Sequence, residues 1–307
     1  GQRTPPDTEA AAAEFWASAE RVKAELGVFR VYNADQSGIS FEYLPRRTVN
    51  SSGEKTVWVR CSGKEKERFT GMFLADSEGN QYAPFFVLRT IPSKDITTAQ
   101  DNTTVSHGFG ARPWKDIRAL SQQTGAQIFG NRCGWWNAEL TVEFLDFHFA
   151  NRSTDEPVLL LLDDLSAHWT EAAASRALDL NVYLLVVPPG LTSVRQPADV
   201  SRFGPTKRRL REKWVQFLMQ QPRVYDGRAT DTPFRLQPPT RSDAIQWTCK
   251  TWSTLGSKVI KSGFKCQTKR DEESEPYRDE LVERLQSLLI VNEELRDRDD
   301  VLKENAE

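Results

Sequence analysis

The pattern of apolar and polar positions divides the chain into alternating helical and extended segments. Apolar residues recur at helical spacing in four segments, which predicts helices over 8–26, 135–150, 170–178 and 205–218. Alternating or continuous apolar runs predict strands over 28–35, 68–76, 81–90, 157–163 and 181–189. The last two strands are joined by a short helix, which indicates a parallel pair covered on both faces. The order predicts an α/β fold whose sheet has mixed direction.

The segment from 68 to 90 has the sequence of a β-hairpin. The turn residues Ser-Glu-Gly-Asn at 77–80 separate its two apolar strands. Pro84 favours an edge strand, because proline cannot donate a hydrogen bond to a neighbouring strand. Residues 36–67 and 91–123 show no clear periodicity, so we predict irregular structure there, with room for one strand in the first.

Composition limits the classes of protein that this chain can belong to. Its 307 residues allow one large domain or two smaller ones, and 38% hydrophobic with 27% charged residues is ordinary for a soluble globular protein. The four cysteines form no C-x-x-C pair, which argues against a structural zinc site and a disulfide framework and indicates a reducing intracellular compartment. No apolar run approaches the roughly 18–20 residues that span a membrane, and no signal peptide is present, so no membrane partner is expected.

Charge is unevenly distributed along the chain. Residues 271–307 carry 14 acidic and five basic side chains, so this segment bears −9, whereas the remainder bears +7 within a total of −2. A basic body with an acidic tail is compatible with a nucleic-acid partner, and equally with a solvated surface and tail.

The acidic tail also carries a leucine repeat. Leucines recur every seven residues at 281, 288, 295 and 302, and Asn292 occupies a position that specifies register in coiled-coil dimers. We therefore consider a homodimer formed through 277–303. The alternative is a single helix that packs on its own body or stays frayed.

Three aspartates follow predicted strands. Asp35 ends the first strand, Asp163 ends the strand 157–163, and Asp199 follows the last strand by a loop. Ligands of open α/β sheets bind beyond the carboxyl ends of strands, where these side chains converge. Clustered carboxylates repel each other unless a cation offsets their charge, and hard oxygen ligands suit Mg²⁺ or Mn²⁺. Two such ions about 3.5–4 Å apart support phosphodiester chemistry. The alternative is that each aspartate only caps the next helix.

Three motifs carry a resemblance to a known family. The stretch PPGLTSVRQPADVSRFGPTK, residues 188–207, resembles the DDE superfamily endonuclease domain of pogo- and Tigger-like transposases, to which centromere protein B and the jerky proteins are related. LLLLDDLSAH at 159–168 resembles the family strand that carries Asp163 and His168, and VYNADQSGIS at 31–40 resembles the motif of the first acid. The resemblance covers about residues 10–267.

The resemblance implies an RNase H-like fold, a mixed five-stranded sheet flanked by helices with a C-terminal helical extension. It implies that Asp35, Asp163 and Asp199 bind two Mg²⁺ or Mn²⁺ ions. The domain would then cleave DNA strands at transposon ends and transfer the freed 3′-hydroxyl to target DNA. This activity implies a nuclear location. The side chains expected around these ligands are Gln36, Asp164, His168 and Gln196. Gln36 departs from the family, which usually has glutamate there, and Asp164 replaces the asparagine or glycine of many members.

The predicted organisation has four parts. They are a leader and helix over 1–27, a catalytic core over 28–220, a helical part of the same domain over 221–267, and an acidic helical tail over 268–307. No helix-turn-helix segment is present within the sequence. We therefore expect the catalytic domain of something longer, or a domesticated remnant that binds DNA or protein without catalysis. The intact acids favour the enzyme.

A run of cations surrounds the third acid. Its members are Arg195, Arg202, Lys207, Arg208, Arg209 and Arg211. Beside a metal site they would attract a DNA backbone, and otherwise they form a solvated helix face. Trp135 and Trp136 could stack on an extruded base, although the apolar helix that they open favours a place in the core.

A nucleotide-binding Rossmann enzyme is a weaker alternative. No G-x-G-x-x-G follows a predicted strand, and the stretch HGFGARPW at 107–114 does not match that motif. No small-molecule cofactor is therefore expected.

Overall fold

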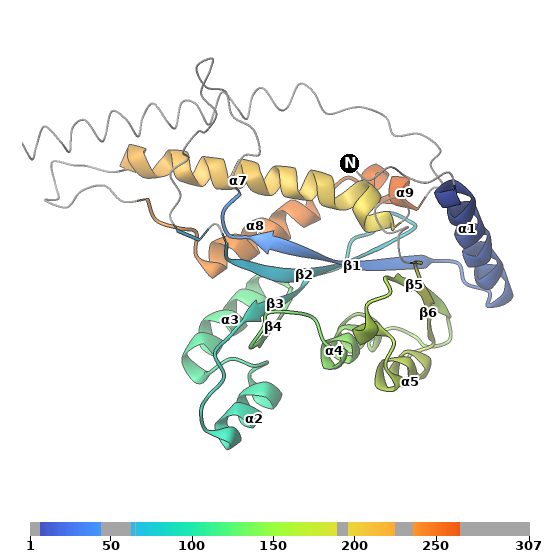
Figure 1. Ribbon diagram of the computed structural model, residues 1–307, viewed down its shortest axis with the longest axis horizontal. Helices are drawn as coiled ribbons and strands as arrows, with labels where there is room; N and C mark the ends of the chain where they lie inside the picture. The colour runs from blue at the N-terminus through green and yellow to red at the C-terminus, as the bar shows by residue number, and fades with distance from the viewer. Residues whose placement is uncertain (1–6, 44–62, 65, 189–195, 225–235, 265–307) are drawn as a thin grey trace, which may run out of the picture. The chain divides into compact units, whose positions relative to one another are not determined.

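The computed structural model describes residues 7–43, 63–64, 66–188, 196–224 and 236–264 (Figure 1). The strands are β1 Val31–Ser40, β2 Arg68–Asp76, β3 Phe85–Arg89, β4 Gln127–Asn131, β5 Val158–Leu162 and β6 Val182–Val186. The helices are α1 Asp7–Glu25, α2 Ile96–Val105, α3 Ala111–Thr124, α4 Ala138–Phe149, α5 Glu171–Asp179, α7 Phe203–Val224, α8 Arg241–Ser253 and α9 Ser257–Gly263. A 3₁₀ turn, η1 Ser166–His168, and a π-helical turn, η2 Ala198–Arg202, complete the described elements.

The strands form one sheet in the order β4-β3-β2-β1-β5-β6. β1 pairs parallel with β5 and β5 with β6, whereas β2 and β3 are antiparallel. This mixed RNase H-like sheet flanked by helices confirms the predicted fold class. It has six strands rather than five, because β4 adds to β3 in parallel, at a segment for which no strand was predicted.

The added strand changes the position of the hairpin. β3 lies between β2 and β4, so the predicted edge position for Pro84 is wrong. Pro84 instead precedes β3, where its missing N–H costs nothing and its carbonyl accepts a hydrogen bond of 3.1 Å from the Gln127 N–H.

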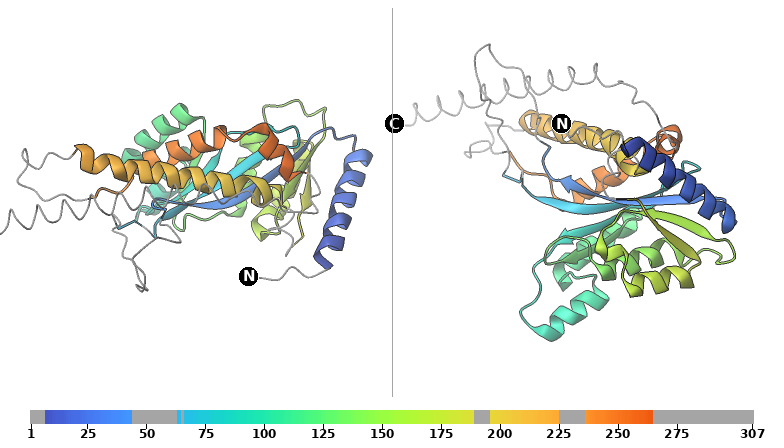
Figure 2. Two further views of the ribbon diagram at one scale, coloured as in Figure 1. Left: turned by 90° about the horizontal axis from the view of Figure 1, so that it is seen from above. Right: turned by 45° about the vertical axis from the view of Figure 1, so that its right-hand side comes forward.

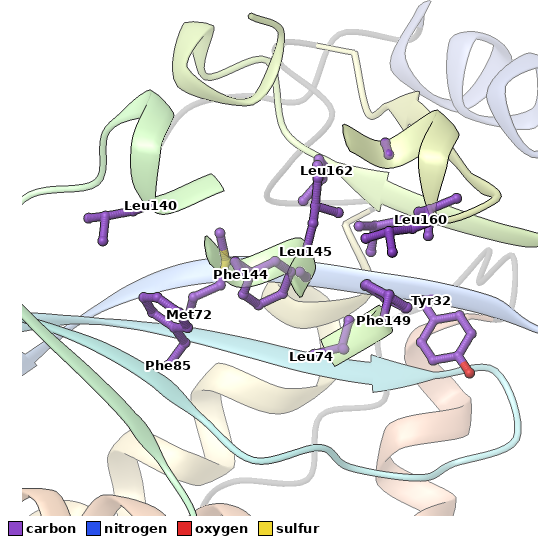
Figure 3. Packing of buried hydrophobic residues seen from close by; sticks show 14 of the residues in the cluster. Tyr32, Met72, Leu74, Phe85, Leu140, Phe144, Leu145, Phe149, Leu160 and Leu162 are labelled. Atoms are coloured by element: carbon purple, nitrogen blue, oxygen red, sulfur yellow. The ribbon is translucent and has the colours of Figure 1, made fainter. Parts of the chain in front are cut away.

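The two faces of the sheet are buried by different helices. Tyr32, Leu160 and Leu162 belong to a cluster with residues of α4 and α5. Phe144 and Phe149 of α4 project into this cluster (Figure 3). Because side chains alternate along a strand, the intervening residues face the other way. Val31, Leu159 and Leu161 pack there with Phe15 of α1, and Figure 2 shows α1 and the pair α4 and α5 on opposite sides of the sheet.

β1 is longer than the apolar pattern predicted. It continues through Asp35 to Ser40, and Ile39 and Ser37 are buried beyond the predicted end. The prediction that Asp35 ends a strand is therefore wrong, because polar residues occupy inward positions that the periodicity could not identify. Asp35 lies within the strand.

Two helices replace the irregular structure predicted over 91–123. α3 buries Ile117 and Leu120, whereas α2 buries no residue and so has no apolar face that a sequence pattern could reveal. Asp95 caps α2 by accepting a hydrogen bond from the Thr98 N–H.

The chain forms two compact units, each assembled from separate stretches. One holds the described residues within 1–39, 69–206 and 248–269, and the other those within 40–68 and 207–247. The second unit has its own apolar cluster around Trp214, Val215 and Leu218. In the described part of the chain, no helix is both long and apolar enough to cross a membrane. The segment 277–303 lies outside the described residues, so the coiled-coil dimer stays a prediction.

Candidate active site

The parallel register of β1 and β5 places Asp35 and Asp163 side by side. Val31 pairs with Leu159 and Asn33 with Leu161. Continuing this register by two residues places Asp35 beside Asp163, which directly follows β5. Asp35 is buried, whereas Asp163 is partly exposed.

A buried asparagine ties the segment of the third acid to these two strands. Asn33 Nδ2 donates to the Leu161 carbonyl of β5 at 3.2 Å, and Asn33 Oδ1 accepts from the Ala198 N–H of η2 at 3.1 Å. Arg202 at the end of η2 donates to the same oxygen. Asp199 lies on this turn and is exposed. The sequence reasoning missed Asn33, although its side chain lies on the Asp35 face of β1, two residues earlier.

The three carboxylates interact electrostatically. Burial raises the pKa of Asp35 well above its usual range, and the charges of Asp199 and Asp163 raise it further. The Gln36 N–H, 2.6 Å from Asp35 Oδ1, and the charge of Arg202 oppose this rise without reversing it. Asp35 is thus a site where a proton or a cation would relieve repulsion.

The donor set fits a hard divalent cation, because carboxylate oxygens are the ligands that Mg²⁺ and Mn²⁺ prefer. Within the described residues, however, no three Asp, Glu, His or Cys side chains lie close enough together to hold one ion. The arrangement is therefore a group of interacting carboxylates, and not a closed coordination shell.

His168 is buried beside Asp163 and connects it to the core. His168 is only 1% exposed, so it is not a surface histidine. His168 Nε2 lies 3.3 Å from Asp163 Oδ1, and Nδ1 lies 3.2 Å from the Thr141 hydroxyl, which accepts a hydrogen bond from Trp136 Nε1 at 2.9 Å. The sequence reasoning missed Thr141, which occupies an ordinary position in α4.

His168 keeps Asp163 in its charged form. Burial raises the pKa of Asp163, but the hydrogen bond and charge of His168 and the Leu165 N–H outweigh burial and lower it below its usual value. Asp35 and Asp163 are therefore tuned in opposite directions.

The other residues predicted around the ligands differ in burial and in their contacts. Gln36 Nε2 lies 3.4 Å from His168 Nε2, so Gln36 adjoins the same histidine. Gln196 is buried two residues before η2, whereas Asp164 is exposed.

The predicted cations separate into three groups. Arg195 lies outside the described residues. Lys207 is exposed and Arg208, Arg209 and Arg211 are partly exposed on α7, within the second unit. Arg202 is completely buried, with its guanidinium bonded to Asn33. The prediction that Arg202 contacts DNA is corrected, because its charge faces the acids from inside the core.

The tryptophan pair also separates. Trp136 is 8% exposed and belongs to the core cluster, whereas Trp135 is 65% exposed. The core alternative therefore holds for Trp136 only.

A cavity of about 250 Å³ lies elsewhere in the first unit. It is lined by residues of α2, β4 and the start of α4, among them Asn102 and Glu139, and by His107 between α2 and α3. None of the three acids lines it, so the cavity is distinct from the carboxylate site.

Comparison with known proteins gives three findings. A sequence model of the family described as DDE superfamily endonuclease matches residues 102–264, more than half of the chain, a range that holds Asp163 and Asp199 and begins after Asp35. The Pogo transposable element with KRAB domain of Mus musculus is 26% identical over 252 residues, which are 81% of this chain and 37% of that protein. Its Homo sapiens counterpart is 25% identical over 241 residues, 78% of this chain and 35% of that protein.

The chain thus spans little more than a third of the length of these relatives. Among solved structures, the Mos1 Strand Transfer Complex aligns with a TM-score of 0.45 and 11% identity, covering 94% of this chain and 64% of that chain.

Proposed function

The chain belongs to the DDE superfamily endonuclease family, and we propose that it is a divalent-metal-dependent DNA endonuclease and strand-transfer domain that acts in the nucleus. In this proposal Asp35, Asp163 and Asp199 hold two Mg²⁺ or Mn²⁺ ions.

The observation that carries the proposal is the electrostatic interaction of three acids from distant parts of the chain. Asp35 is buried, and both other carboxylates raise its pKa. A buried carboxylate beside two further negative charges opposes folding unless a cation or a proton offsets the repulsion. Family membership favours the cation.

The residues would have different roles in one common site. When bound, the two ions would activate the attacking oxygen and stabilise the leaving oxygen of a phosphodiester. His168 keeps Asp163 ionised and oriented. Exposed Asp199 lies a few residues before Lys207, Arg208 and Arg209, whose charges would attract a DNA backbone.

Nicking of a supercoiled plasmid in the presence of Mn²⁺ tests the proposal. We expect Asp163→Asn and Asp199→Asn to lower the rate by about 10³-fold or more, because each removes one member of a group that acts as a unit. Asp101→Asn, an exposed carboxylate of α2, is the matched control and should nick as the wild type does. Equal nicking by all four proteins would reject the metal role of the acids.

His168 provides a prediction about orientation. Replacing a side chain that orients a metal ligand costs about 10–100-fold in metal affinity or activity, so we expect this loss for His168→Ala. His168→Gln, which can place an amide near Asp163 where Nε2 now lies, should lose less. The dependence of the nicking rate on Mn²⁺ concentration is the measurement, and an unchanged dependence in His168→Ala would contradict the role.

A second candidate is a domesticated module that binds DNA or protein without catalysis. Gln36 favours it, because this position usually holds a glutamate in the family and here carries an uncharged side chain near His168. Calorimetric titration with Mn²⁺ separates the candidates. An enzyme should bind Mn²⁺ in a manner that Asp163→Asn abolishes, whereas an idle module should give no such heat while still binding its partner.

A further inference from the structure

A rigid turn follows β4 and presents one tryptophan to solvent. Asn131 Oδ1 accepts hydrogen bonds from the N–H groups of Cys133, Gly134 and Trp135, at 3.1, 2.6 and 3.3 Å. Its Nδ2 donates to the Trp135 carbonyl at 2.7 Å. Gly134 has a φ of +69°, a left-handed conformation that few other residues adopt. The backbone that carries Trp135 is therefore held in place before any ligand binds.

Trp136, the residue after Trp135, connects this turn to the buried side chains that contact Asp163. Trp136 is buried, its Nε1 donates to the Thr141 hydroxyl, and its ring centroid lies 6.1 Å from that of His168. His168 in turn contacts Asp163. The two adjacent tryptophans therefore have different surroundings. Trp136 packs against His168 behind the carboxylate site, and Trp135 is exposed on the turn.

The sheet places the turn along the edge where Asp163 lies. β1 is parallel to β5, and β1 and β2 run in opposite directions (Figure 3), as β2 and β3 do. β3 and β4 therefore end at the same edge as β5. Asp163 follows β5 and Trp135 follows β4, so a strand of nucleic acid lying along this edge meets both.

Two exposed cations flank the turn. The backbone of Arg89, at the end of β3, lies directly beside the turn, since a Cβ added at Gly134 would lie 3.0 Å from the Arg89 backbone nitrogen. Arg132 belongs to the turn itself and is also exposed. Across the described part of the chain, neither guanidinium makes an ion pair or a hydrogen bond. The turn therefore carries two positive charges beside the exposed ring, while Glu139 and Glu143 line the cavity that Arg132 also lines.

We propose that Trp135, Arg89 and Arg132 form a subsite for an unpaired stretch of DNA next to the aspartate site. The indole ring stacks on a base, and the two guanidinium groups hold neighbouring phosphates. An exposed aromatic ring with adjacent cations is the arrangement that binds single strands without sequence preference. Charge complementarity identifies the occupant as a polyanion, and the ring requires an unpaired base. The inference rests on the proposed function for the identity of the nucleic acid.

Fluorescence anisotropy with labelled duplexes, blunt or with a single-stranded extension, tests the subsite in EDTA, where no cleavage occurs. We expect the wild type to bind the extended duplex more tightly than the blunt one. Trp135→Ala should weaken binding of the extended duplex roughly 5- to 150-fold and leave the blunt duplex unchanged, and Trp135→Phe should retain most of the affinity.

Two further variants make the test specific. Phe29→Ala removes an aromatic ring that is 90% exposed just before β1, at the opposite edge of the sheet, and should bind as the wild type does. Arg89→Gln and Arg132→Gln should each lower the slope of log affinity against log salt by about one.

Two outcomes would overturn the subsite. They are equal affinity of the wild type for both duplexes, and equal affinity of Trp135→Ala and wild type for the extended one. Because binding is measured without metal, a failure of nicking with intact extension binding would reject only the catalytic proposal.

Discussion

Asp35→Asn is expected to stabilise the metal-free protein and, at the same time, to abolish Mn²⁺-dependent nicking. Burial and the charges of Asp199 and Asp163 raise the pKa of Asp35, so its ionised form opposes folding. Asparagine has nearly the same shape without the charge. The loss of nicking should reach about 10³-fold or more, since the proposed function makes Asp35 a ligand of the metal ions.

The pH dependence follows from the direction of the shift. In the unfolded chain the pKa of Asp35 is the ordinary value of 3.8, and in the folded protein it is higher. The contribution of such a carboxyl to stability is lost as pH rises through the folded pKa. Below the unfolded value the carboxyl is protonated in both states, and wild type and Asp35→Asn should then unfold alike. The advantage of Asp35→Asn should appear above pH 3.8 and grow toward neutrality, as thermal denaturation across pH would show.

Asp163→Asn is the matched control, because the shift at Asp163 has the opposite sign. Its pKa is lowered through His168, so its charged form stabilises the fold above the unfolded value, and this contribution is lost as pH falls through the folded pKa. Both variants should lose nicking, but Asp163→Asn should lower the melting temperature of the metal-free protein and Asp35→Asn should raise it. Shifts of the same sign would show that the two acids are not tuned separately.

Mn²⁺ adds a further readout to the same measurement. An ion that binds only the folded state raises its stability, so wild type should melt at a higher temperature with Mn²⁺. Asp35→Asn should show little or no such rise. A full rise in that variant would exclude Asp35 as a ligand.

Arg202→Met is expected to lower the free energy of unfolding by about 3–5 kcal/mol. This is the usual cost of leaving a buried charge without the opposite charge beside it. Arg202 is completely buried, donates to Asn33 Oδ1 and lies 5.7 Å from the ring centroid of Phe264. Burial lowers the pKa of its guanidinium, and the charges of Asp35 and Asp199 oppose that effect. Removing Arg202 would leave the acids without this cation and Asn33 with one fewer donor.

Chemical denaturation of the metal-free protein measures this loss. Arg118→Met, on the exposed face of α3, is the control and should change stability by no more than about 0.5 kcal/mol. The double variant Asp35→Asn with Arg202→Met should lose less than the sum of the single effects, because the two charges interact. A loss below about 1 kcal/mol for Arg202→Met would show that the acids do not depend on this cation.

The sequence by itself determined the strands that carry the acids and the family to which the chain belongs. β5 is a continuous apolar run ending at Asp163, and such a run can only be stable when both of its faces are covered. The Gln-Pro-x-Asp motif identified the segment of Asp199. These features are local, because periodicity and residue type within a few positions suffice to express them.

Only the tertiary structure decided which of several like residues, close together in the sequence, is buried and which is exposed. Trp135 and Trp136 are identical in type, yet the hydrogen bonds of Asn131 direct one to solvent while Thr141 receives the other in the core. Arg202 lies in a run of cations but is the one bonded to Asn33. Burial and charge depend on contacts between residues far apart in the chain. Composition and spacing record which side chains are available, but not which of them meet.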